Sequence, residues 1–164
     1  MVINQKDMTE EKRKIKQSLF LIIGLFFVIL TIFQVNAETN VTDCQTLSTA
    51  NTIYQLNQSI SNDTITGNCI IISAANITLD CQGYSIASVM NYSGVYSNKV
   101  NTTVKNCNIS MGSGGNTEAI GIKYDTGANN GAIYNNNVTG NEGYGIYVGQ
   151  TYAYAIFNTN ITNN

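Results

Sequence analysis

Short alternating runs of apolar and polar residues, separated by glycine and asparagine, fill the chain from residue 38 onwards. Within these runs, apolar residues recur at every second position, which is the period of a β-strand with one buried face. No apolar stripe with helical spacing continues for ten residues in this part of the chain. The pattern therefore predicts many strands of three to five residues joined by sharp corners, with helices absent or trivial.

Two short motifs alternate along the second half of the chain and define one repeat of about 25 residues, a period typical of solenoid proteins. The first reads apolar, any residue, Asn, any residue, Asn, apolar, and begins at Val104, Ile133 and Ile156. The second begins with glycine and occurs three times: GVYS from Gly94, GIKY from Gly121 and GIYV from Gly145. One such unit cannot bury its apolar face alone, so the repeat predicts parallel strands stacked coil upon coil about 4.8 Å apart.

The repeat assigns a place to each aligned residue. Inside a three-sided tube, one column of side chains should consist of Val95, Ile122 and Ile146, and another of Val104, Ile133 and Ile156. A structural ladder of side-chain amides, which point inward at a corner and tolerate left-handed dihedrals, is expected at Asn106, Asn135 and Asn158. A second column, Asn108, Asn137 and Asn160, contains three glycosylation sequons, and corner asparagines are the equal alternative for it.

The segments NITLDCQGYSI from Asn76 and TTVKNCNISM from Thr102, with the later coils, resemble the right-handed parallel β-helix repeat proteins. That family includes pectate-lyase-like folds, carbohydrate-binding and sugar-hydrolase repeat domains of surface proteins, and periplasmic copper-binding-like repeats. The resemblance implies an all-β, right-handed, single-stranded parallel β-helix of about five coils over residues 70–164. Residues 38–69 would form an N-terminal cap and first coil, and we expect the β-helix to be truncated after residue 164.

The first 37 residues have the pattern of an export segment. Five basic residues between positions 6 and 16 precede a long apolar run from Leu19 to Phe33, and Val35 and Ala37 follow. This order is typical of a secretory signal cleaved after Ala37. An uncleaved apolar helix that anchors the chain in a membrane through residues 17–37 is the alternative. In both cases we expect the rest of the chain to be extracellular or at the cell surface.

Sequons and cysteines agree with export. Nine N-x-[ST] sequons are possible glycan acceptors: Asn40, Asn57, Asn62, Asn76, Asn91, Asn101, Asn108, Asn137 and Asn160. All four cysteines follow the apolar segment, and the spacings Cys44 to Cys69 and Cys81 to Cys107 each equal about one coil. We therefore predict these two disulfides. Stacked free thiols in the core are the alternative.

Composition excludes several classes of function. Beyond residue 37 the chain has three lysines, no arginine and seven acidic residues, so it lacks the basic patches that bind nucleic acid. The whole chain contains no histidine, which removes histidine triads and histidine metal sites. Its polarity comes from 24 asparagines and 14 glycines, residues typical of turns.

No catalytic, cofactor or metal site is predicted. The lyases that the chain resembles use a basic residue beside acid-bound calcium, and the related hydrolases use clustered aspartates with histidine and arginine. The acids here are dispersed, and stacking brings only Glu118 and Glu142 to a spacing of one coil. Copper would need histidine, thiolate or paired methionines, whereas Met90 and Met111 stand alone, and nothing in the spacing asks for calcium at Asp125.

Outward-facing positions hold aromatic and basic side chains in two lines, namely Tyr96, Lys123 and Tyr147, and Lys105, Tyr134 and Phe157. Five of these residues could contact a glycan: Tyr96, Lys123, Tyr147, Tyr134 and Phe157. Aromatic pairs that merely stabilise the sheet are the alternative. We expect an exported structural or glycan-contacting module without its own catalysis. A second hypothesis is the N-terminal part of a polysaccharide lyase or glycoside hydrolase whose active site lies beyond residue 164.

Overall fold

The computed structural model describes residues 12–20, 38–112, 119–140, 143–149 and 160–164. The chain divides into two units, Met1–Val35 and Asn36–Asn164. In the first unit, residues 12–20 are helical. Over the described residues, no helix has the length and apolar character needed to cross a bilayer. The predicted anchor and cleavage site lie outside the described residues, except for positions 17–20.

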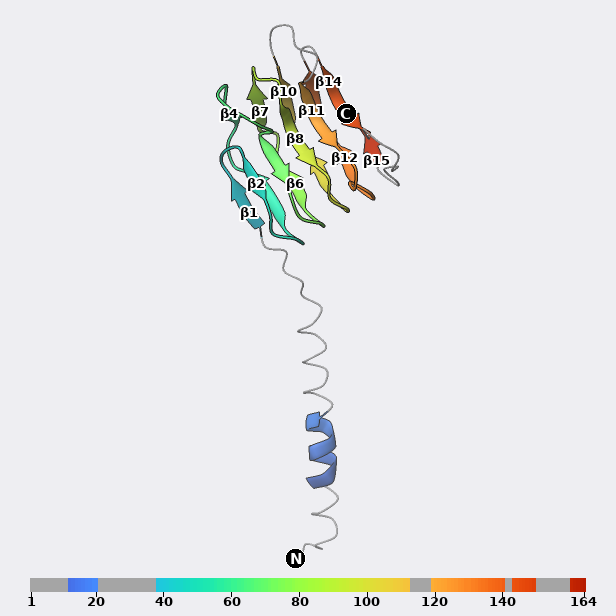
Figure 1. The fold of residues 1–164 in the computed structure, drawn as a ribbon. Coiled ribbons are helices and arrows are strands. Elements are labelled where there is room, and N and C mark those ends of the chain that lie inside the picture. Colours follow the sequence, from blue (N-terminus) through green and yellow to red (C-terminus); the bar gives the residue numbers. More distant parts are fainter. Residues whose placement is uncertain (1–11, 21–37, 113–118, 141–142, 150–159) are drawn as a thin grey trace, which may run out of the picture. The chain divides into compact units, whose positions relative to one another are not determined.

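The second unit is built from three parallel sheets, which we call A, B and C (Figure 1). Sheet A contains β1 (Glu38–Val41), β3 (Ile53–Leu56), β6 (Thr78–Asp80), β9 (Thr103–Lys105), β12 (Ala132–Tyr134) and β15 (Asn160–Thr162). Sheet B contains β2 (Gln45–Leu47), β5 (Ile70–Ile72), β8 (Ser93–Ser97), β11 (Ile120–Tyr124) and β14 (Tyr144–Val148). Sheet C contains β4 (Ile60–Ser61), β7 (Ser85–Ser88), β10 (Asn108–Met111) and β13 (Asn137–Gly140).

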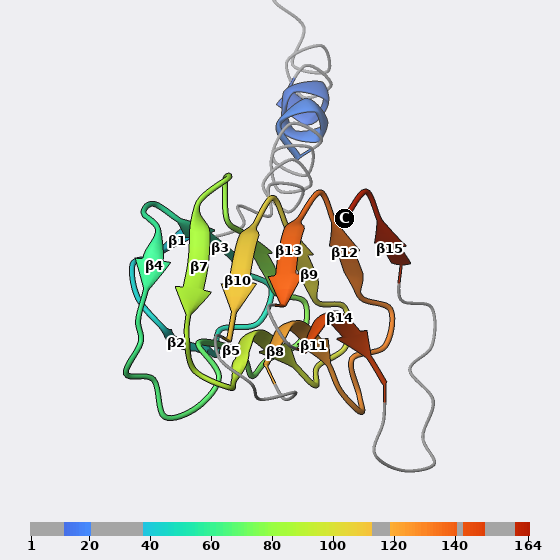
Figure 2. The same cartoon turned by 90° about the horizontal axis from the view of Figure 1, so that it is seen from above.

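The chain visits sheets A, C and B in turn and then returns to sheet A one strand further along (Figure 2). This winding confirms the predicted parallel β-helix. The four strands of sheet C mark about four complete turns, whereas about five coils were expected. The difference arises at the start, where β1 leads to β2 without an intervening strand in sheet C.

The inward column that defines the tube is confirmed. Ile122 of β11 pairs with Val95 on one side and with Ile146 on the other. Val95 and Ile122 are fully buried, and Ile146 is half-buried against the core. The glycine that opens this motif has a steric cause: a Cβ on Gly94 would lie 2.7 Å from Cγ2 of Ile109 in sheet C. At this point sheets B and C lie so close together that sheet B has no room for a side chain.

The predicted position of the third asparagine motif, which begins at Ile156, is wrong. Ile133 pairs with Val104, as expected, but on its other side it pairs with Ile161 rather than with Ile156. By the same register, Tyr134 faces Thr162 rather than Phe157, and Asn160 lies beside Ala132 instead of following Asn137. Ile156, Phe157 and Asn158 lie outside the described residues.

The physical reason is that two overlapping sequences, IFNTNI and ITNN, both fit the motif. The second places a side chain that bonds with the coil before it: Asn164 Nδ2 donates to the Ile133 carbonyl oxygen, and Asn164 Oδ1 accepts from Asn136 Nδ2 at 2.9 Å. Buried polar groups require such partners, so the hydrogen bonds favour the later register.

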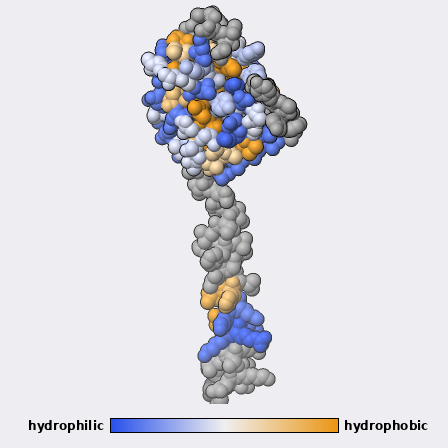
Figure 3. Space-filling model, in the orientation of Figure 1, coloured by the Kyte–Doolittle hydropathy of each residue, from blue (hydrophilic) through white to orange (hydrophobic). Residues whose placement is uncertain are grey.

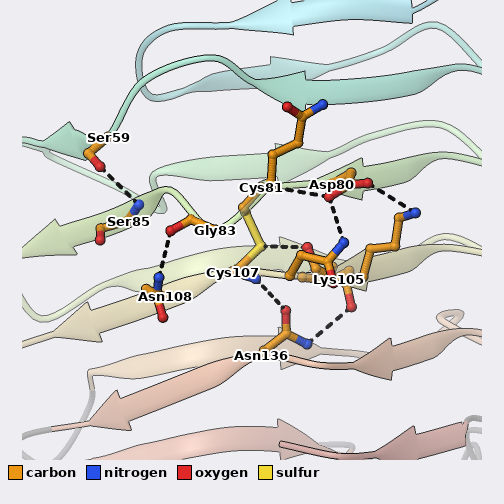
Figure 4. Close-up of a disulfide and its surroundings, with 12 residues drawn as sticks. Ser59, Asp80, Cys81, Gly83, Ser85, Lys105, Cys107, Asn108 and Asn136 are labelled. Atoms are coloured by element: carbon orange, nitrogen blue, oxygen red, sulfur yellow. Dashed lines mark hydrogen bonds and ion pairs between the residues drawn. A yellow bond between two sulfur atoms is a disulfide. The ribbon is translucent and has the colours of Figure 1, made fainter.

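Both predicted disulfides are present, and they join neighbouring coils. Cys44 and Cys69 have Cα atoms 4.4 Å apart, and those of Cys81 and Cys107 are 4.7 Å apart. Both separations match the spacing of adjacent strands. The free-thiol alternative is therefore wrong. Figure 4 shows the second bridge between β6 and β9, with Asp80 and Lys105 on one side and Asn136 in the next coil.

Candidate functional site

The three faces of the β-helix differ in their outward chemistry. The face of sheet C has small, uncharged side chains, namely Ser85, Ala87, Asn108, Ser110, Asn137 and Thr139. The face of sheet A contains an ion pair, and the face of sheet B contains the aromatic residues considered below. In the space-filling view, apolar residues form small patches among polar ones rather than one continuous apolar surface (Figure 3). On the face shown, a recognition site would therefore have to come from specific side chains.

The first of the two predicted lines is present on sheet B. Lys123 pairs with Tyr96 on one side and with Tyr147 on the other, so the three side chains occupy successive rungs. The Lys123 ammonium lies 5.9 Å from the centroid of each ring, within reach of a cation–π contact. We call these three residues the Tyr–Lys strip.

Asp125 sets the electrostatics of the Tyr–Lys strip. Its Oδ2 lies 3.4 Å from Lys123 Nζ, and the two side chains are about a quarter exposed or less. Burial and the negative charge of Asp125 raise the pKa of the Tyr96 phenol, and the positive charge of Lys123 opposes part of this effect. Tyr96 therefore stays protonated at neutral pH and can donate a hydrogen bond to a ligand.

A groove of about 390 Å³ adjoins the strip, and Lys123 belongs to both. Its lining includes Asn68, Asn91, Tyr92, Ile120, Lys123 and Tyr144. Tyr144 is 59% exposed, and its ring centroid lies 5.6 Å from that of Tyr147. Asn68 Oδ1 accepts the Ser93 N–H at 2.9 Å, which fixes the Asn68 side chain at the groove. We call this feature the Asn91 groove.

The Asn91 groove was not predicted from the sequence. Its walls come from the residues before the glycine motif, where Ser93, Ile120 and Tyr144 align in neighbouring coils. Extending the repeat alignment by one residue towards the N-terminus would have placed these three side chains together. Asn68 and Asn91 belong to connections between strands, where the repeat gives no register.

The second predicted line, on sheet A, is only partly assembled. Lys105 pairs with Tyr134 on one side and with Asp80 on the other. Lys105 Nζ lies 3.0 Å from Asp80 Oδ2. The hydrogen bond to Asp80 raises the pKa of Lys105, against the opposing effect of burial. Because Phe157 lies outside the described residues, only one aromatic ring of this line, that of Tyr134, is shown beside the lysine, and the line gives weaker support for a binding site.

The predicted amide ladder is displaced by one residue. Asn106 and Asn135 adopt left-handed backbone conformations with φ near 56°, as expected, but Asn135 is exposed rather than inward-facing. The buried amide is Asn136, whose Oδ1 accepts the Cys107 N–H and whose Nδ2 donates to the Val104 carbonyl oxygen. In the next coil, Asn136 therefore occupies the inward position that Cys81 and Cys107 hold in the two coils before it.

An exposed ladder of asparagines, not predicted from the sequence, lies before β3, β6 and β9. Asn76 Nδ2 donates to Asn51 Oδ1 at 2.9 Å, and Asn101 Nδ2 donates to Asn76 Oδ1 at 2.8 Å. All three residues have positive φ. Their spacing of 25 residues was the available sign of this ladder. Both ladders are structural, because their amides are used to join coils.

Among the residues that the structure describes, no three histidine, cysteine or acidic side chains are placed to hold a metal ion. Glu118 and Glu142, the two acids expected one coil apart, lie outside the described residues. Asp80 and Asp125 are each paired with a lysine. The arrangement best suited to hold a ligand is thus the Tyr–Lys strip with the Asn91 groove. No protein-family model matches this chain, and neither the curated proteins nor the solved structures contain a significant match to it.

Proposed function

We propose that this chain is an exported, cell-surface β-helix module that contacts glycans and has no catalysis of its own. The observation that carries the proposal is the alignment of Tyr96, Lys123 and Tyr147 on successive rungs beside an amide-lined groove. The sequence resemblance to carbohydrate-binding and sugar-hydrolase repeat domains supports the same class of ligand.

The chemistry of these side chains suits a sugar. Aromatic rings offer flat apolar surfaces with a polar hydroxyl at one end, and sugar rings have apolar C–H faces bordered by hydroxyls. The carboxamides of Asn68 and Asn91 and the ammonium of Lys123 can exchange hydrogen bonds with those hydroxyls. Tyr96 and Tyr147 lie two rungs apart, about 9.6 Å along the β-helix. A polymer lying along the strip would meet both rings.

Two features support export. The disulfides Cys44–Cys69 and Cys81–Cys107 are of the kind that persist in oxidising compartments. The N-terminal order of basic residues, apolar run and small residues matches a secretory signal or an anchor. A surface location would also bring the strip into contact with polysaccharides.

Binding to a glycan array tests the proposal. Protein with intact disulfides should bind at least one glycan class, and Tyr96→Ala and Tyr147→Ala should each weaken that binding about fivefold, because one aromatic contact is worth about 1 kcal/mol. Tyr84→Ala, which alters an exposed tyrosine between β6 and β7 and outside both predicted lines, is the matched control and should retain affinity. Absence of binding to every glycan would leave the chain a purely structural module. An equal loss in the control would show that the Tyr–Lys strip is not the binding site.

A further inference from the structure

Three sequon asparagines already use their side-chain nitrogen to join neighbouring coils. The Nδ2 atoms of Asn76 and Asn101 donate to the exposed ladder between coils. Asn108 Nδ2 donates to the Gly83 carbonyl oxygen at 2.6 Å. A sugar on any of these nitrogens would take the space of an inter-coil hydrogen bond. Glycosylation there would therefore work against the stacking that stabilises the fold.

Asn91 has a different environment. It lies in the bend between β7 and β8 and is half-buried, and its side chain lines the groove beside Lys123 and Tyr144. Within the described part of the chain, its Nδ2 donates no hydrogen bond. An attached sugar would thus begin inside the groove without displacing a contact between coils.

We propose that Asn91 is an N-glycan acceptor and that the attached glycan folds into the Asn91 groove, so that the first sugar ligand of this surface belongs to the chain itself. The inference rests on the proposed function, because it uses the same affinity of Tyr144 and Lys123 for sugar rings. The new element is that the sugar in the groove is covalently attached to the same chain. It also predicts that the glycosylated chain has its binding groove partly covered.

Glycan transfer must precede folding. Asn91 Nδ2 forms a bond to the anomeric carbon of a lipid-linked oligosaccharide and loses a proton, and the lipid phosphate or pyrophosphate leaves. The third sequon residue, Ser93, is 4% exposed, and its N–H is bonded to Asn68. An enzyme that recognises the Ser93 hydroxyl can reach it only before β8 pairs with β5 and β11. The folded protein should therefore be a poor acceptor.

The test uses the full chain secreted from a host that transfers N-linked oligosaccharides. Site-resolved mass spectrometry should find Asn91 occupied in wild type, and Asn91→Gln should lose that glycan alone. An endoglycosidase should release the Asn91 glycan about tenfold more slowly from the native than from the reduced, denatured protein, because the folded groove protects it. Tyr144→Ala, which removes an exposed side chain, should abolish the protection.

Further outcomes separate this inference from the proposed function. Unglycosylated wild-type protein should bind the array, and in glycosylated material Asn91→Gln should bind more strongly than wild type. Array binding combined with an unoccupied Asn91, or with equal release from native wild type and Tyr144→Ala, would overturn this inference alone. No array binding by the unglycosylated protein, with Asn91 occupied and its glycan protected, would overturn the proposed function for external glycans and retain the intramolecular contact.

Discussion

Single side chains join neighbouring coils at the β6–β9 contact. Asp80 accepts hydrogen bonds from Asn106 Nδ2 and the Gln82 N–H, and it pairs with Lys105. Burial alone raises the pKa of Asp80, but these bonds outweigh it and leave the pKa below its ordinary value. The carboxylate form therefore stabilises the fold.

Acid should weaken this contact. A carboxyl group whose pKa is lowered by folding stabilises the protein above its ordinary pKa, and that stability is lost as the pH falls through the folded-state pKa. We expect the urea midpoint to fall between about pH 5 and pH 2, and to fall less in Asp80→Asn, which should start from a lower stability. Glu38→Gln, which alters an exposed carboxyl group in β1, is the control. An identical pH profile in wild type and Asp80→Asn would contradict the assignment.

At the scale of elements, β8 and β11 depend on glycine where they approach sheet C. A Cβ on Gly94 would meet Cγ2 of Ile109 at 2.7 Å and the Gly121 carbonyl oxygen at 2.9 Å. Backbone cannot move aside as a flexible side chain can, so the strand would have to shift.

Gly94→Ala should therefore lower the free energy of unfolding by about 1–3 kcal/mol, the usual cost of overpacking a core. Gly67→Ala is the matched control, because a Cβ there meets nothing within 4 Å. Urea unfolding followed by circular dichroism measures both variants. Equal stability of the two would show that sheets B and C can separate without cost.

The elements were predictable to the extent that the repeat is regular. Val95, Ile122 and Ile146 could be aligned because each follows a glycine, and the packing leaves no room for a Cβ at two of these glycines, Gly94 and Gly121. The third asparagine motif could not be placed from pattern alone, because Ile156 and Ile161 both fit it and tertiary hydrogen bonds of Asn164 decide between them. The inward amide was misplaced because a left-handed residue changes which neighbour faces the core.

The candidate site was predictable only in its regular part. The Tyr–Lys strip lies within strands, where alternation and period fix both face and rung. The Asn91 groove also depends on Asn68 and Asn91, which lie in connections of unequal length. Sequence period carries no information about where such connections place their side chains.

For the whole molecule, the disulfides act as fixed joins between successive coils. Cys81 and Cys107 are both buried, and they are 26 residues apart in the sequence. Closing a loop of this length removes conformational entropy from the unfolded chain.

The double variant Cys81→Ala/Cys107→Ala should therefore be less stable by about 3 kcal/mol, because opening the loop returns conformational entropy to the unfolded chain. Denaturant unfolding under oxidising conditions measures the difference. The Cys44–Cys69 disulfide closes a loop of nearly the same length, so the double variant Cys44→Ala/Cys69→Ala should lose a similar amount of stability. Unchanged stability in either double variant would mean that the unfolded chain is already restricted without the bridge.

The corner column that begins with Cys81 and Cys107 continues as the amides of Asn136 and Asn164. A pulling force along the chain would thus encounter covalent joins in the early coils and only hydrogen bonds in the later ones. Solenoid coils come apart largely one at a time, so extension would begin with the amide-joined coils. The segments enclosed by each pair of cysteines could contribute no length until their sulfur–sulfur bond was cut.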